Sequence, residues 1–115
     1  MHGASAEIVS RVQAADRERT PLCINGAGTK SFLGQPVQNC QSLDVAANSG
    51  IIEYDPAELV LVARAGTSLR EIEETLSSHR QMLGFEPPFS GSGATIGGAV
   101  AAGLAGPRRA YAGAV

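Results

Sequence analysis

Two stretches rich in glycine hold the residue types best suited to chemistry in this chain. The first glycine stretch is Asn25-Gly26-Ala27-Gly28-Thr29-Lys30-Ser31, and the second begins Gly91-Ser92-Gly93-Ala94-Thr95-Ile96-Gly97-Gly98 and continues to Gly106. Glycine reaches positive φ and has no Cβ, so successive N–H groups in such loops can surround an anion. We interpret the first loop, with the hydroxyls of Thr29 and Ser31, and the N-terminus of a helix starting near Thr95 as two donor clusters that suit a diphosphate.

Neither stretch matches a standard nucleotide-binding motif. The dinucleotide fingerprint Gly-x-Gly-x-x-Gly fails at its third glycine, where the chain has Ser31 and Ile96. The P-loop requires glycine directly before Lys-Ser, and Thr29 stands there. The pattern therefore gives no support for nucleotide hydrolysis.

Each glycine stretch also has a purely structural interpretation. The first is compatible with an ordinary turn after a strand. In the second, Gly97, Gly98 and Gly103 fall within one short helix, and each costs about 1 kcal/mol relative to alanine there. Something must therefore come close to the backbone of that helix, and either a packing partner or a cofactor would serve.

The composition excludes several functions. The chain has 115 residues, a net charge of −2 and no long basic run, so it has no nucleic-acid footprint. Cys23 and Cys40 lack a metal-ligand spacing, and His2 and His79 are far apart, so we expect neither a metal site nor a disulfide framework. No acid/base pair or activated nucleophile is visible, and we assign no catalytic residue.

The chain shows no secretory or membrane-spanning pattern. Its N-terminus lacks a basic region followed by an apolar core, so a cytoplasmic location is expected. The uncharged run from Phe89 to Pro107 is rich in Gly and Ser, and its apolar part is shorter than the ~20 residues that a spanning helix needs.

Several helices and strands are expected to position the glycine stretches. Apolar residues at helical spacing predict a helix over Ile8 to Ala15, and a capping box at Ser68-Leu69-Arg70-Glu71 begins another helix that runs to about His79. Its apolar stripe is Leu69, Ile72 and Leu76. A third helix of small residues is expected from Thr95 to Leu104.

Short apolar runs predict the strands. Leu22 to Ile24, Ser42 to Val45 and Met82-Leu83 are expected to form a small parallel sheet, with the first glycine stretch at a carboxyl end, where α/β proteins usually bind ligands. Ile51 to Tyr54 and Leu59 to Ala65 predict a hairpin with its turn at Asp55-Pro56-Ala57-Glu58. This hairpin is expected to start a second, antiparallel sheet. The expected fold is α+β.

Taken in order, four segments carry a family resemblance: PLCINGAGTKSFLG, IIEYDPAELVLVARAGTSLREIEETL, QMLGFEPP and ATIGGAVAAGLAGPRRAYAGAV. They resemble the N-terminal part of the vanillyl-alcohol-oxidase, or PCMH-type, FAD-binding domain. Within that family they are most similar to the FAD-binding E subunits of bacterial glycolate oxidases. The resemblance covers nearly the whole chain from Pro21 onward, and it implies that residues 1–115 are one partial FAD-binding domain, without the rest of that domain or a substrate domain.

The resemblance implies FAD as the cofactor. The pyrophosphate would lie at Gly26 to Ser31, the region from Pro87 to Gly98 would line the pyrophosphate, ribityl and flavin side, and Gly103 would permit close backbone approach. The implied cofactor-binding residues are Asn25, Gly26, Ala27, Gly28, Thr29, Lys30, Ser31, Pro87, Pro88, Gly93, Ala94, Thr95, Gly97, Gly98 and Gly103. Some relatives attach flavin through a histidine in the first loop, and this loop has none, so non-covalent FAD is expected.

The resemblance also implies a function and partners. The chain would be the FAD-binding component of a complex that oxidises glycolate to glyoxylate, beside a sister flavin subunit and an iron–sulfur subunit, in the cytoplasm or peripheral to the inner membrane. Two alternatives stay open: a non-catalytic fragment that associates with a partner subunit or with another copy, and a flavoprotein of the same family that acts on another substrate. The short chain is not expected to be active alone.

Overall fold

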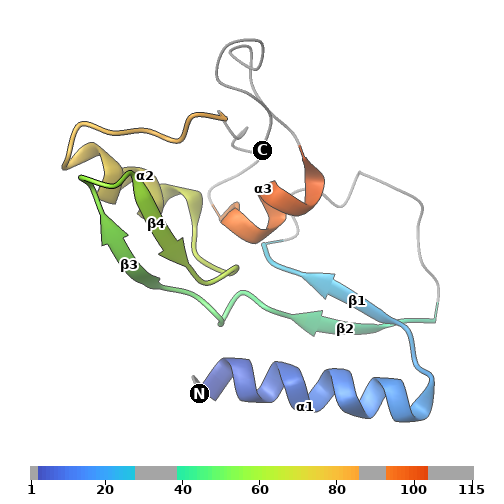
Figure 1. Ribbon diagram of the computed structural model, residues 1–115. Helices are drawn as coiled ribbons and strands as arrows, with labels where there is room; N and C mark the ends of the chain where they lie inside the picture. Colours follow the sequence, from blue (N-terminus) through green and yellow to red (C-terminus); the bar gives the residue numbers. More distant parts are fainter. Residues whose placement is uncertain (1–2, 28–38, 86–92, 104–115) are drawn as a thin grey trace.

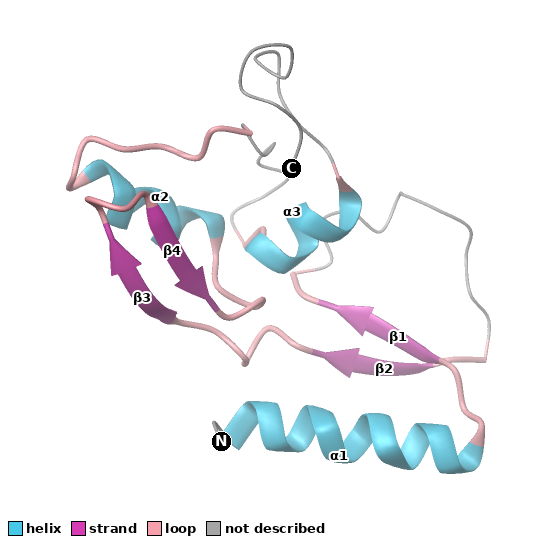
Figure 2. Ribbon diagram, in the orientation of Figure 1, coloured by secondary structure: helices cyan, strands magenta, loops and turns pink. Residues whose placement is uncertain are grey.

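A computed structural model describes residues 3–27, 39–85 and 93–103 (Figure 1). The elements in order are α1 (Gly3–Glu18), β1 (Leu22–Asn25), β2 (Gln41–Asp44), β3 (Ile51–Asp55), β4 (Val60–Ala63), α2 (Leu69–Ser77) and α3 (Ile96–Ala102). The fold is α+β, as the sequence predicted (Figure 2). Helix α1 is longer than the predicted helix, and α3 ends just before its predicted end.

β1 and β2 form a two-stranded parallel sheet. Leu22 is paired with Gln41, and the register continues to Asn25 and Asp44. Helix α1 lies along this sheet (Figure 1), and the Arg11 guanidinium donates to the Ser42 carbonyl at 2.7 Å. The packing between them is thin, because Leu43 is the only residue of the two strands that is buried.

β3 and β4 form the predicted antiparallel hairpin. Ile51 is paired with Ala63 and Asp55 with Val60, with an irregularity between Ile51 and Glu53. The Asp55 carboxylate accepts hydrogen bonds from the N–H groups of Ala57 and Glu58, which stabilises the turn as the sequence indicated.

The capping box at the start of α2 is confirmed at its N-cap. The Ser68 hydroxyl accepts the Glu71 N–H at 3.1 Å, and the predicted apolar stripe of Leu69, Ile72 and Leu76 is buried. Leu69 joins Ala94 and Ala99 in a core cluster, so the main core lies between α2 and α3.

The predicted strand at Met82-Leu83 is wrong. Arg80 has a left-handed φ of 56°, and the Gln81 N–H donates back to the Leu76 carbonyl, so this segment closes the C-terminal end of α2. Leu83 packs against the core cluster. The parallel sheet therefore has two strands among the described residues, not three.

A buried threonine joins the chain that enters β3 to the chain that leaves β4. Thr67 is fully buried. Its hydroxyl accepts the Gly50 N–H at 2.9 Å and donates to the Arg64 carbonyl at 2.6 Å. Beside it, a Cβ on Gly66 would lie within 2.6–2.8 Å of the carbonyl oxygens of Val45, Ala46 and Asn48. Only glycine fits where the chain leaving β2 crosses the chain leaving β4.

None of the helices in the described part of the chain is long and apolar enough to cross a membrane.

Candidate functional site

The described ends of the two glycine stretches lie against each other. A Cβ on Gly26 would lie 2.8 Å from Thr95 Oγ1, and a Cβ on Gly93 would lie 3.3 Å from the Ala27 Cβ. We call this contact between residues 25–27 and 93–95 the glycine seam. It lies where β1 ends and α3 begins (Figure 1), at the carboxyl end of a parallel strand.

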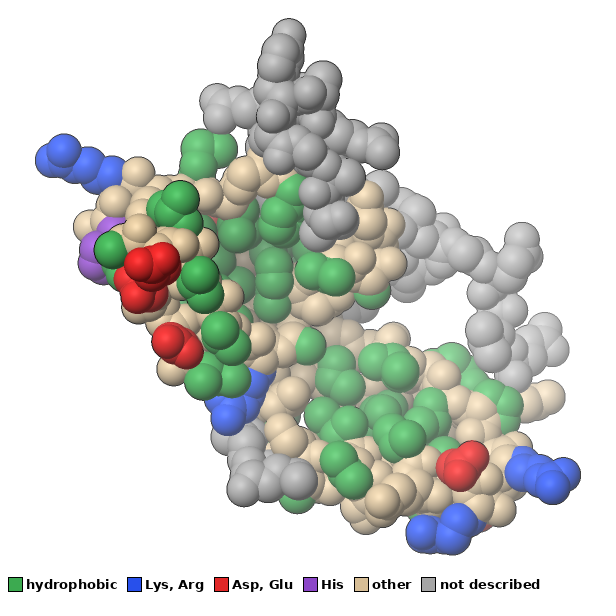
Figure 3. All heavy atoms as spheres, viewed as in Figure 1, with side chains coloured by type: hydrophobic (Ala, Val, Ile, Leu, Met, Phe, Trp, Pro, Cys, Tyr) green, Lys and Arg blue, Asp and Glu red, His purple; other side chains and the backbone are tan. Residues whose placement is uncertain are grey.

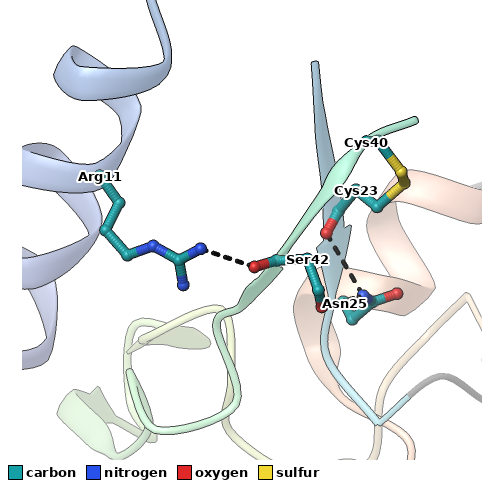
Figure 4. Close-up of a disulfide and its surroundings, with 5 residues drawn as sticks. All are labelled: Arg11, Cys23, Asn25, Cys40 and Ser42. Carbon is teal, nitrogen blue, oxygen red and sulfur yellow. Dashed lines mark hydrogen bonds between the residues drawn. A yellow bond between two sulfur atoms is a disulfide. The ribbon is translucent and has the colours of Figure 1, made fainter. Parts of the chain in front are cut away.

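Asn25 is fixed by the sheet that carries it. Its side-chain amide donates to Ser42 Oγ at 3.0 Å and to the Cys23 carbonyl at 3.3 Å (Figure 4). The Asn25 carbonyl accepts the Val45 N–H at 2.9 Å. These bonds tie the end of β1 to β2 and engage the side-chain amide of Asn25, whose assignment to the cofactor site stays a prediction.

The first N–H groups of α3 already have protein acceptors. Ile96 donates to the Thr67 carbonyl at 2.9 Å, Gly97 donates to the Ala65 carbonyl at 2.9 Å, and Gly98 donates to the Thr95 hydroxyl at 3.1 Å. The predicted second donor cluster therefore has no free amide at these three residues. The assignment of Gly97 and Gly98 to the cofactor site stays a prediction. It would require the cofactor to pass close to their backbone without accepting a hydrogen bond from these N–H groups.

The glycines of α3 have separate structural reasons. A Cβ on Gly97 would lie 2.8 Å from both the Cβ and the carbonyl oxygen of Ala65, so a packing partner accounts for this glycine. Gly103 has φ 67° and caps the helix in the left-handed conformation, and no atom of the described residues lies within 4 Å of an added Cβ. The left-handed cap accounts for this glycine, and the expectation that Gly103 permits close backbone approach to the cofactor stays a prediction.

The remaining predicted site residues lie outside the described residues: Gly28, Thr29, Lys30, Ser31, Pro87 and Pro88. Within the glycine seam itself the side chains are small and none is an acid or a base. In residues 3–27, 39–85 and 93–103, no group of His, Cys, Asp and Glu side chains could hold a metal ion. The seam can position a ligand, and it brings no proton-transfer group of its own.

The comparisons with known proteins identify the family of the chain and its cofactor. A family model described as an FAD binding domain matches residues 3–115. The chain belongs to the FAD binding domain family. FAD is thus its cofactor, and the small-residue seam at the end of β1 is compatible with backbone approach to a pyrophosphate.

One curated relative is similar over most of the chain. Glycolate oxidase subunit GlcE of Escherichia coli (strain K12) is 51% identical over 111 residues, which are 96% of this chain and 31% of that relative. This FAD binding domain chain thus spans about a third of the relative's length. No solved structure matches it.

This FAD binding domain contains a disulfide that was not predicted from the sequence. Cys23 of β1 and Cys40, directly before β2, are bonded, with their Cα atoms 5.7 Å apart (Figure 4). The expectation of no disulfide was wrong because it considered only local spacing, whereas parallel pairing brings together residues 17 positions apart. The signal available was that each cysteine lies beside a predicted strand of the same sheet.

An apolar groove of about 550 Å³ lies on another part of the domain. Its lining includes Leu61, Ile72, Leu76 and Phe85, together with Ile96 from the first turn of α3. Large apolar side chains are also exposed on the hairpin, among them Leu59 and Val62. Figure 3 shows apolar side chains gathered over both halves of the visible face.

Proposed function

We propose that the chain is the FAD-binding component of a glycolate oxidase, and that the glycine seam faces the FAD pyrophosphate. The observation that carries the proposal is the contact of the two glycine stretches, Gly26 with Thr95 and Ala27 with Gly93. The stretches are far apart in the sequence, and the fold places them together at the end of β1. The similarity to a subunit named for glycolate oxidase supports the choice of substrate.

The chain's own share of such a reaction is binding and positioning. Bound FAD supplies the redox chemistry by accepting the hydride equivalent that a 2-hydroxyacid loses on oxidation. The small side chains of Ala27 and Gly93, both exposed, leave room for a pyrophosphate to approach the backbone. The chain is proposed to hold FAD non-covalently, because the first glycine stretch contains no histidine.

A matched pair of charge substitutions tests the position of the pyrophosphate. Ala27→Asp places a carboxylate in the seam, and Ala6→Asp places the same group on an exposed position of α1. Repulsion of about 1–4 kcal/mol between nearby charges predicts FAD binding weaker by about fivefold or more for Ala27→Asp and unchanged binding for Ala6→Asp. Affinity is measured by isothermal titration and by the flavin absorption spectrum. Equal affinity for the two variants would refute the proposed position.

We further propose that the domain works in a complex with a sister flavin subunit and an iron–sulfur subunit. Exposed apolar residues such as Leu59, at 78% exposure, and Val62 support association with another protein surface. Co-expression with candidate subunits followed by size-exclusion chromatography tests this. A chain that elutes separately from both, while binding FAD, would favour a flavoprotein of the same family with another substrate.

A further inference from the structure

β1 has little side-chain support in the FAD binding domain, as do the hairpin strands β3 and β4. Leu22 and Cys23 are half-buried, while Ile24 and Asn25 are exposed, so no side chain of this strand is fully buried. In the described part of the chain its only strand partner is β2, and a two-stranded sheet by itself is marginally stable in water. Side-chain packing alone therefore holds β1 weakly.

β2 is better anchored than β1. Leu43 is buried at 2% exposure, and the Ser42 carbonyl accepts the Arg11 guanidinium of α1 at 2.7 Å. The Cys23–Cys40 bond joins the weakly held strand to the residue that leads into the anchored one (Figure 4). The bond thus extends the anchoring of β2 to the strand that ends in the glycine seam.

We propose that the Cys23–Cys40 pair is a redox-dependent clamp on the FAD-binding end of β1. With the disulfide formed, Gly26 and Ala27 are held against Thr95 and Gly93; with two thiols, that contact loosens. The effect on FAD rests on the proposed function, whereas the effect on β1 does not. Nothing in the proposed oxidation of a 2-hydroxyacid requires this bond, so the clamp is an additional property of the chain.

The chemistry is a reversible two-electron exchange with a cellular thiol reductant. Two reductant thiols become a disulfide and pass two electrons and two protons to the Cys23–Cys40 bond, which becomes two cysteine thiols. Both cysteines are half-buried rather than enclosed, so a small thiol can reach the bond. In reducing compartments the disulfides that do occur are usually transient or redox-sensing.

The size of the effect follows from loop closure. The bond closes a segment with a sequence separation of 17, and a loop of that size restricts the unfolded chain enough to change an opening equilibrium roughly 100-fold. We therefore expect amide hydrogen exchange in residues 22–27 to be on the order of 100-fold faster after reduction, with residues 51–63 of the hairpin as the internal control.

The experiment compares the full chain before and after dithiothreitol treatment, with Cys23→Ser/Cys40→Ser as the matched variant. Alkylation under non-reducing, denaturing conditions, followed by intact mass, first shows whether the bond is present. The clamp predicts fast exchange in the reduced chain and in the variant alike, and no response of the variant to reductant. Alkylation of both cysteines without reductant, or equal exchange in the two redox states, would overturn it.

FAD titration of the same samples separates the clamp from the proposed function. Tighter binding by the oxidised chain supports both. Equal binding by both states overturns the coupling to the cofactor. Changed exchange in β1 without FAD binding in either state supports the clamp and refutes the proposed function for this chain.

Discussion

Replacing Gly97 by alanine tests whether the glycines of α3 are there for packing or for the cofactor. In the structure the Gly97 backbone lies directly on Ala65, and its N–H donates to the Ala65 carbonyl at 2.9 Å. If Gly97 were required only by a bound cofactor, replacing it with alanine would leave the unfolding free energy of the FAD-free chain unchanged or raise it. A glycine required by Ala65 makes the methyl group costly in the absence of any ligand.

The expected cost follows from three terms. The added Cβ would lie 2.8 Å from both the Cβ and the carbonyl oxygen of Ala65, and forced overpacking costs ~1–3 kcal/mol. Moving α3 away weakens the bond from Gly97 to Ala65, worth about 1 kcal/mol. Alanine regains about 1 kcal/mol of helix propensity. The net loss of unfolding free energy is about 2 kcal/mol, or roughly 8 °C in Tm for a domain of this size.

Gly98→Ala is the matched control on the same helix. Its added methyl group would lie 3.2 Å from the Thr95 hydroxyl, a side-chain group that can shift slightly, so we expect a change within about 1 kcal/mol. Urea unfolding followed by circular dichroism measures both variants, because the chain has no tryptophan to report by fluorescence. If Gly97→Ala is as stable as Gly98→Ala without FAD, the packing explanation is refuted.

Two further substitutions test the buried Thr67 hydroxyl and the C-terminal cap of α3. Thr67→Val removes the acceptor of the Gly50 N–H at a fully buried position, and it should lower the unfolding free energy by about 2 kcal/mol in urea titrations. Thr67→Ser keeps the hydroxyl and should cost about half as much. Equal losses for the two variants would show that the hydroxyl is dispensable. Gly103→Ala puts a side chain at φ 67° and should cost ~1 kcal/mol by thermal unfolding, with a smaller loss for Gly103→Asn, and an unchanged Tm would contradict the left-handed cap.

The local elements of the fold could be predicted because their signals are short in sequence. The capping box at Ser68, the buried stripe of α2 and the hairpin turn at Asp55 each depend on residues within a few positions of one another. The amphipathic pattern of α1 was also sufficient to place a helix there. Patterns of this kind predict secondary structure, and they do so without information on which other element each helix or strand packs against.

The contacts between elements could not be predicted, because they depend on which segments, distant in the sequence, lie together in the fold. Nothing near Thr67 in the sequence indicates that its hydroxyl accepts the Gly50 N–H, and the Cys23–Cys40 pair follows only once β1 and β2 are known to be neighbours. Met82-Leu83 was mistaken for a strand because a short apolar run looks the same whether it enters a sheet or covers a helix end. Both errors come from reading sequence-local signals where the tertiary contact decides.

The glycines of this chain serve several physical needs, and contacts within the domain account for some of them. Gly97 packs on the Ala65 backbone and Gly26 packs on Thr95, so contacts within the domain already account for both glycines. Gly93 differs: it is exposed, has no positive φ, and among the described residues has only the Ala27 Cβ within 4 Å of an added Cβ. Within the described part of the glycine seam, Ala27 and Gly93 are therefore the surface most open to a pyrophosphate. A substitution at Gly97 should report on folding, and Ala27→Asp should report on the cofactor.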